Sequence, residues 1–237
     1  MTTAQQPGPR MVGFALIELA VVIAVLGLLI AATSAAYTNI DRVGDRQQAK
    51  SHAESVRDAL RAYALSHGHL PCPEPYPDPA TSSRNQASHG RSGDCDSGSG
   101  PARGWVPYRT IGMSVPGPGY RAFYAVHRDG TDADLAAIDS ARLTDDALIR
   151  GLRAIGARSQ TAYIDANPGS SGCRRNGRAV AFFVIVPLAD RDGDGQRFDD
   201  PHPDNCASPP SLGARHDNDD LVIVESPAAL VGWLQRP

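Results

Sequence analysis

The sequence predicts an α+β fold in which one long amino-terminal helix packs on a mostly antiparallel sheet, with long disulfide-braced loops. An apolar run over 14–37 continues without proline into a stretch whose apolar residues have helical spacing. Two later segments, 179–186 and 221–225, are rich in β-branched and aromatic residues, as strands are. Four cysteines lie in polar stretches between the predicted elements, where disulfides would brace the loops.

The length and charge of the chain limit its class. At 237 residues it exceeds the roughly 100 to 200 typical of one domain, so one globular domain plus an appendage fits best. A net charge of -3 and a pI near 6.1 leave no basic surface of the kind that nucleic-acid binding needs. Nucleic acid is therefore not expected as a main partner.

The apolar run Phe14–Tyr37 predicts a transmembrane helix. It contains one charged residue, Glu18, and about 20 apolar residues suffice to cross a bilayer as a helix. A secretory signal peptide has an apolar stretch of only about 7 to 15 residues, which is shorter than this run. The small residues between Ala31 and Ala36 nevertheless leave conventional signal cleavage open as an alternative.

Glu18 is the most informative residue of the run. A lone carboxylate in a membrane segment costs on the order of 3 kcal/mol, so it needs a compensating partner or position. One explanation is structural, because the helix macrodipole favours an anion near the first turn. The neighbours of Glu18 favour a different explanation, since Gly13 to Leu19 stand as G-F-A-L-I-E-L at the predicted membrane boundary.

This motif resembles the prepilin processing site of type IV pilins and type II secretion pseudopilins. The resemblance implies that prepilin peptidase removes a leader, residues 1–13, by cutting after Gly13, and that Phe14 becomes the N-methylated first residue. It also implies that Glu18 pairs with the amino group of a neighbouring subunit during filament assembly, which offsets the cost of burying either charge alone. Two features depart from the family pattern. The leader has only one basic residue, Arg10. Basic residues also follow the apolar run 14–37 closely, and the positive-inside rule would place that side of the membrane segment in the cytoplasm. These basic residues are Arg42, Arg46, Lys50 and Arg57.

The resemblance implies a pilin-like structural subunit, either a pseudopilin or a minor pilin, and not an enzyme. Its partners would be other pilin or pseudopilin subunits, prepilin peptidase, an inner-membrane assembly platform and membrane lipid. The protein is expected in the bacterial inner membrane, single-pass with its carboxyl-terminal domain in the periplasm, and then in a periplasmic or surface filament. Two alternatives stay open: a surface pilin that acts as an adhesin or DNA-binding module, and a membrane-anchored periplasmic enzyme. No catalytic residue is predicted, because no motif places a nucleophile beside a base.

Residues 38–67 predict an amphipathic continuation of the membrane helix. Their apolar residues recur at steps of three and four, and Gly68 and Pro71 predict the helix end. A membrane-anchored coiled coil is the alternative, but the apolar stripe lasts fewer than three or four heptads. The globular α+β domain is then expected over 68–237. The predicted stripe consists of Ala49, Ala53, Val56, Leu60 and Tyr63.

The predicted domain begins with a long loop over 71–104, which is dominated by Pro, Ser, Gly, Asp and Arg. The segments L-P-C-P at 70–73 and G-W-V-P-Y at 104–108 also resemble a pseudopilin-like group. Beyond the loop, periodicity and composition predict strands, a helix and a capped closing helix. These are a strand at Tyr120–Val126, a helix at Asp134–Ile155, strands at Ala179–Val186 and Leu221–Glu225, and a helix from the cap Ser226 and Pro227 to Leu234.

Four cysteines in an extracytoplasmic protein imply two disulfides, with three possible pairings. We favour pairing of neighbours, Cys72 with Cys95 and Cys173 with Cys206. A zinc site fits poorly, because no Cys-x-x-Cys pair or repeated ligand spacing is present.

An acidic stretch from residue 190 begins like a calcium loop of the EF-hand type. Carboxylates at positions one, three and five, and a glycine at the sixth, suit calcium, but the twelfth position is Pro201 and not glutamate. A structural calcium ion would resemble that of the major pseudopilins, whereas a solvated acidic turn without an ion is the alternative. No cofactor is required in either case. The candidate ligands are Asp190, Asp192, Asp194, Gln196, Asp199 and Asp200, with Asp217, Asp219 and Asp220 as later additions.

Overall fold

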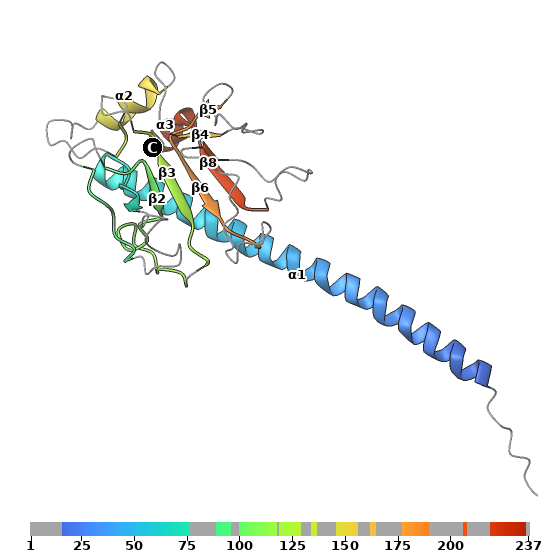
Figure 1. Cartoon of the computed structure of the whole chain (residues 1–237). Coiled ribbons are helices and arrows are strands. Elements are labelled where there is room, and N and C mark those ends of the chain that lie inside the picture. Colours follow the sequence, from blue (N-terminus) through green and yellow to red (C-terminus); the bar gives the residue numbers. More distant parts are fainter. Residues whose placement is uncertain are drawn as a thin grey trace, which may run out of the picture. The chain divides into compact units, whose positions relative to one another are not determined.

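A computed structural model gives the structure of the chain (Figure 1). It describes residues 16–75, 89–95, 100–117, 119–128, 134–136, 146–155, 162–164, 177–189, 206–207 and 219–235. At residue 16 and over 31–42 and 163–164 it describes the backbone alone. The chain divides into two compact units, Met1–Gly44 and Asp45–Pro237.

The first helix, α1 (Leu16–His67), has 52 residues that belong to both units. No proline interrupts it, and much of its sequence consists of good helix formers such as Ala, Leu and Arg. It ends where Gly68 adopts a positive φ of 71° and donates its N–H to the carbonyl of Ala64 at 3.0 Å. Glycine caps helices in this way because it has no Cβ to strain the left-handed conformation. The predicted helix end is confirmed, while its predicted start at Phe14 lies outside the described residues.

Within the second unit, one face of α1 forms part of the hydrophobic core. The apolar stripe on this face of α1 is buried, and each of its residues is at most 6% exposed. The stripe packs in one cluster with apolar residues of the sheet. Tyr63 was predicted in this stripe, but it is only half-buried and stacks on His67 with ring centroids 3.9 Å apart. Ala64 is buried instead, with 1% of its surface exposed. The buried stripe is Ala49, Ala53, Val56, Leu60 and Ala64.

The main sheet has five strands, all paired antiparallel, in the order β1-β2-β3-β6-β8 (Figure 1). Side chains alternate between its faces, as the strand period of two requires. Tyr124, Phe182 and Val184 join the cluster with α1, whereas Phe123 and Phe183 join a second cluster on the other face. The strands are β1 (Glu74–Pro75), β2 (Arg103–Trp105), β3 (Phe123–Val126), β6 (Phe182–Val186) and β8 (Leu221–Glu225).

A small sheet of three strands in the order β5-β4-β7 contributes to the second cluster. Strand β4 pairs antiparallel with β5 and parallel with β7. Ala162 and Ala207, which lie beside and within this sheet, pack with Phe183 and Ile185 of the main sheet. The main sheet is therefore covered on both faces, which explains why every side chain of β6 is buried. The bounds are β4 (Tyr163–Ile164), β5 (Arg178–Ala179) and β7 (Cys206–Ala207).

Two short helices complete the described fold. Helix α2 (Ala147–Ala154) and helix α3 (Pro227–Leu234) place Leu148, Leu152 and Leu230 in the cluster with α1. The cap of α3 is as predicted: the Ser226 hydroxyl accepts the N–H of Ala229 at 3.1 Å, and Pro227 opens the helix.

The helix predicted over Asp134–Ile155 is shorter in the structure, where only α2 is helical among the described residues of this range. Asp134 to Ala136 are not helical. The Asp134 carboxylate accepts the N–H of Ala136 at 3.1 Å, and its two oxygens share the Nε–H of Arg128, each at 3.2 Å. Such side-chain bonds to nearby backbone compete with the helical pattern.

Three other predicted boundaries were wrong. The strand predicted over Tyr120–Val126 begins only at Phe123, because Tyr120 closes a turn by donating its N–H to the Gly117 carbonyl. The strand predicted over 179–186 is divided between two sheets, since Val180 bonds to Ala162 while Ala181 bonds to Glu225 of β8. The loop predicted over 71–104 contains strand β1 and the beginning of β2, which pair across it. The strand predicted at Leu221–Glu225 is confirmed.

Candidate functional site

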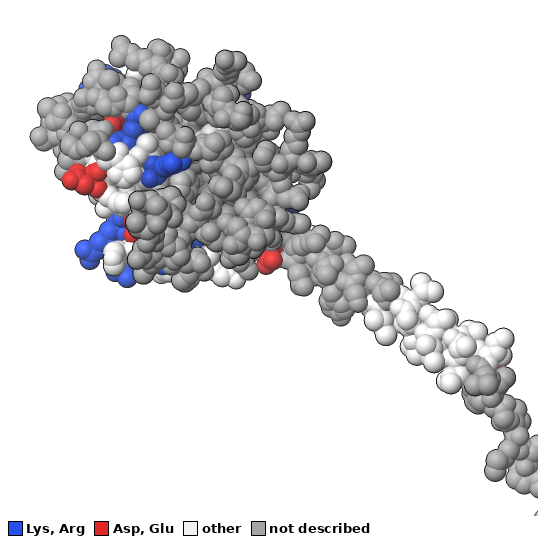
Figure 2. Space-filling view, viewed as in Figure 1, with Lys and Arg blue, Asp and Glu red and all other residues white. Residues whose placement is uncertain are grey.

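An exposed apolar segment of α1, residues 17–30, is the first candidate site. All its side chains are exposed, and its large apolar side chains keep 51% to 74% of their surface accessible. Figure 2 shows this part of the helix almost entirely white. Large contiguous apolar patches on a protein surface mark sites of interaction with proteins or membranes. These side chains are Ile17, Leu19, Val21, Val22, Ile23, Val25, Leu26, Leu28, Leu29 and Ile30.

Among the side chains that the structure describes, no helical stretch is both long and apolar enough to cross a bilayer.

Glu18 lies in the first turn of α1 and is the only charged residue of the segment 17–30. Its side chain is exposed, with apolar neighbours at Ile17 and Leu19. The amino-terminal end of a helix carries a partial positive charge that favours a carboxylate there. Gly13 and Phe14, the predicted processing site, lie outside the described residues.

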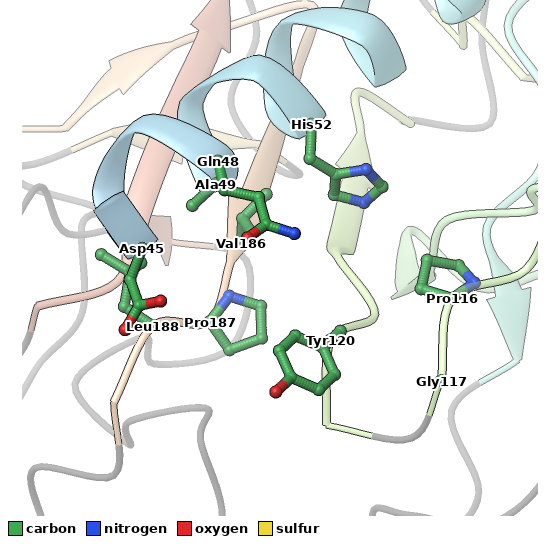
Figure 3. Close-up of a pocket in the computed structure, with 10 residues that line it drawn as sticks. All are labelled: Asp45, Gln48, Ala49, His52, Pro116, Gly117, Tyr120, Val186, Pro187 and Leu188. Atoms are coloured by element: carbon green, nitrogen blue, oxygen red, sulfur yellow. The ribbon is translucent and has the colours of Figure 1, made fainter. Parts of the chain in front are cut away.

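A pocket beside α1 is the second candidate site (Figure 3). Its cavity volume is about 420 Å³. Asp45, Gln48 and His52 reach it from one flank of the helix, and Tyr120 and Pro187 form the opposite wall. The remaining lining residues are Ala49, Pro116, Gly117, Val186 and Leu188.

His52, one of the lining residues, forms a hydrogen bond with Tyr108. Nε2 of His52 lies 3.0 Å from the Tyr108 hydroxyl, whose oxygen accepts the N–H of Ala122 at 2.8 Å. Burial lowers the pKa of His52 below its ordinary value of 6.5 and raises that of Tyr108. A protonated tyrosine and a neutral imidazole therefore face each other, and this pair is satisfied when the hydroxyl donates to Nε2.

An ion pair fixes α1 against the edge of the main sheet. Nη2 of Arg61 donates to both carboxylate oxygens of Glu225, at 3.0 and 2.8 Å. Glu225 ends strand β8 and is only 1% exposed. Breaking a buried pair of this kind by removing one partner typically costs about 3 to 5 kcal/mol, because the remaining charge stays buried. Sequence reasoning missed this contact, since nothing in the local pattern connects residues 164 positions apart.

The loop after α1 is closed by a disulfide between Cys72 and Cys95, whose Cα atoms are 5.8 Å apart. This predicted pairing is confirmed. Cys206 is also disulfide-bonded, and Cys173, its predicted partner, lies outside the described residues.

Buried polar residues order the same loop from inside. The Glu74 carboxylate accepts the N–H groups of His89 and Gly90, and Nη2 of Arg128 donates to the Cys95 carbonyl at 3.2 Å. At Gly104 a Cβ atom would collide with the carbonyl oxygen of Glu74, so the pairing of β1 with β2 requires glycine there.

The predicted calcium ligands Asp190, Asp192, Asp194, Gln196, Asp199 and Asp200 lie outside the described residues, as does Asp217. Asp219 and Asp220 are described, and their carboxylates accept the backbone N–H groups of Ala189 and Leu188. They therefore lie next to the start of the acidic stretch, but their oxygens bind backbone groups. No cluster of three or more His, Cys, Asp or Glu side chains suited to a metal is found in the part of the chain that the structure describes.

Comparison with known proteins adds no relative to this picture. No family model, no curated protein and no solved structure matches the chain. What the protein does is therefore inferred from its own residues and geometry.

Proposed function

We propose that the chain is a structural subunit of a type IV pilin-like filament, either a pseudopilin of a type II secretion pseudopilus or a minor pilin. One observation carries the proposal. A single helix, α1, presents apolar side chains on all sides over 17–30 and only a buried apolar stripe over 49–64. The first half is thus suited to an apolar environment outside the chain, and the second half to its own domain.

The exposed half needs an apolar environment for energetic reasons. Burying a Val, Leu or Ile side chain is worth about 1.5 to 3 kcal/mol relative to leaving it in water. Ten such side chains are exposed in the segment 17–30. Before assembly the inner membrane would cover them, together with the rest of the predicted span 14–37. In a filament, the same segments of neighbouring copies would cover one another.

Glu18 would provide the specificity of this association. The G-F-A-L-I-E-L motif at 13–19 supports cleavage after Gly13 and N-methylation of Phe14. The new amino group of one subunit then pairs with the Glu18 carboxylate of its neighbour. Each charge alone is costly in an apolar filament core, and the pair offsets that cost when its geometry is good. Apolar contacts supply affinity, while this pair sets the register.

The first experiment is the intact mass and amino-terminal sequence of the full chain, expressed in membranes with and without a prepilin peptidase. With the active peptidase we expect a product that begins at N-methylated Phe14. A catalytically inactive peptidase is the matched control, and the chain expressed beside it should keep residues 1–13. An uncut chain in both samples, or a cut after the apolar run near Ala36, would contradict the proposal.

A further inference from the structure

The pocket beside α1 points to a specific contact between subunits. We propose that it receives a lysine or arginine side chain from α1 of a second copy of this chain. The inference rests on the proposed filament function and deepens it, because it names the surfaces through which two domains meet.

The pocket has the chemistry of a site for a cation on an aliphatic stem. Asp45 supplies a carboxylate at one end, and the Gln48 side chain supplies a carbonyl oxygen (Figure 3). Tyr120, which is 53% exposed, presents an aromatic ring of the kind that attracts a cation by its quadrupole. Pro187 and Val186 provide apolar wall against which the methylene groups of a lysine or arginine pack.

His52 does not oppose a cation in this pocket. Its pKa is lowered by burial, so the imidazole is neutral at neutral pH. Tyr108, its hydrogen-bond partner, is also neutral because burial raises the pKa of its hydroxyl. The only formal charge among the lining residues is therefore the carboxylate of Asp45.

The complementary surface lies on the same helix. Arg46 and Lys50 are four residues apart, so they lie on one face of α1, and both are exposed. Arg57 follows on that face two turns after Lys50. At 100° per residue, these basic residues fall on one side of the buried stripe, and Asp45, Gln48 and His52 fall on the other side. Every copy therefore carries an acidic pocket on one flank of α1 and a basic flank on the opposite side.

This arrangement favours a repeating contact over a closed dimer. When the flank of one copy meets the pocket of the next, the second copy still has its own flank available. Such a heterologous contact continues from subunit to subunit and forms an open helical assembly when the rotation does not close a ring. A two-fold dimer would instead require one surface to complement itself, and neither flank does so in charge.

The test uses two full-length variants coexpressed with prepilin peptidase in membranes. One chain carries Gln48→Cys in the pocket and a first epitope tag, and the other carries Lys50→Cys on the basic flank and a second tag. A short bis-maleimide should join the two differently tagged chains at least fivefold more than it joins two copies of either variant alone. Ser51→Cys, an exposed position outside both flanks, is the matched control and should give only background.

Charge reversal supplies the second arm. An exposed ion pair is worth up to about a fivefold difference in an equilibrium, so Asp45→Asn should reduce the cross-linked fraction by about that factor. Asp45→Lys in the pocket chain should reduce it further, and adding Arg46→Asp to the chain that carries Lys50→Cys should restore it. Filaments that form without the Gln48–Lys50 product, or with an equal yield from Ser51→Cys, would overturn the pocket contact alone. Absence of both peptidase processing and filaments would overturn the proposed function, and the contact with it.

Discussion

The two halves of α1 differ in how they use apolar residues. Over 17–30 the apolar side chains surround the helix and all are exposed. Over 49–64 the buried ones form a single stripe, and polar residues such as Glu54 and Asp58 occupy most of the rest of the circumference. An apolar stripe matches a partner on one side, whereas a helix that is apolar all round matches an environment that surrounds it. One continuous helix thus combines an exposed apolar segment with a component of the domain core.

The largest effect on assembly should follow from removing the charge of the first half. Glu18→Gln keeps the size and polarity of the side chain but removes the carboxylate that the proposed amino group needs. We expect membrane insertion to be unchanged and incorporation into filaments to fall by at least about tenfold, which corresponds to 1.4 kcal/mol. Membrane fractionation and quantification of sheared filaments measure the two properties. Asp in place of Glu18 is the control that keeps the charge; normal assembly of Glu18→Gln would refute the role of the carboxylate.

The same truncation should have opposite outcomes in the two halves. Leu60→Ala removes a fully buried side chain from the core, and such changes cost about 2 to 5 kcal/mol. Leu26→Ala removes a side chain that is 52% exposed, and we expect little change in domain stability. The stabilities of the two variants are compared by thermal unfolding of the full chain in detergent, monitored by the near-ultraviolet circular dichroism signal. Equal destabilisation by the two variants would mean that the halves are not independent in this way.

The smallest effect should come from the pH dependence of the second half. Because burial lowers the folded pKa of His52, the unfolded chain binds more protons as pH falls below about 6.5. Stability that is complete above that pH should therefore be lost progressively as pH falls toward the folded pKa. The melting temperature of the wild type between pH 8 and pH 5, minus that of His52→Gln, isolates this contribution. Gln keeps an acceptor for the Tyr108 hydroxyl, so the variant changes the titrating group while it can retain the hydrogen bond. A difference that does not change with pH would show that His52 does not titrate in this range.

Local signals in the sequence predicted the local structure well. The end of α1 at Gly68, the cap of α3 at Ser226 and the strand Leu221–Glu225 depend on residues close to them in the chain. The apolar stripe of the helix was also largely correct, because period and burial are directly linked. The expectation that neighbouring cysteines pair predicted the Cys72–Cys95 disulfide correctly.

Contacts between distant segments could not be predicted in this way. Strand β1 has two residues, Glu74 and Pro75, and its composition contains no strand signal; it exists because β2 pairs with it. The break in the strand predicted over 179–186 arises because another sheet takes its first residues. The pocket was missed for the same reason, since Asp45 and His52 read as part of a solvated helix face until Tyr120 and Pro187 are placed opposite them.

The ion pair between Arg61 and Glu225 also constrains the order in which the domain folds. Its partners are separated by 164 residues, and Glu225 belongs to the last strand of the sheet. Contacts of such long range form late, because the intervening chain must first be ordered. While the chain is being synthesised from its amino terminus, α1 is complete long before its full set of core partners exists. A chain that stops before β8 would lack Glu225, the buried partner of Arg61, and would leave part of the helix stripe uncovered, so incomplete chains should be recognisable to proteases.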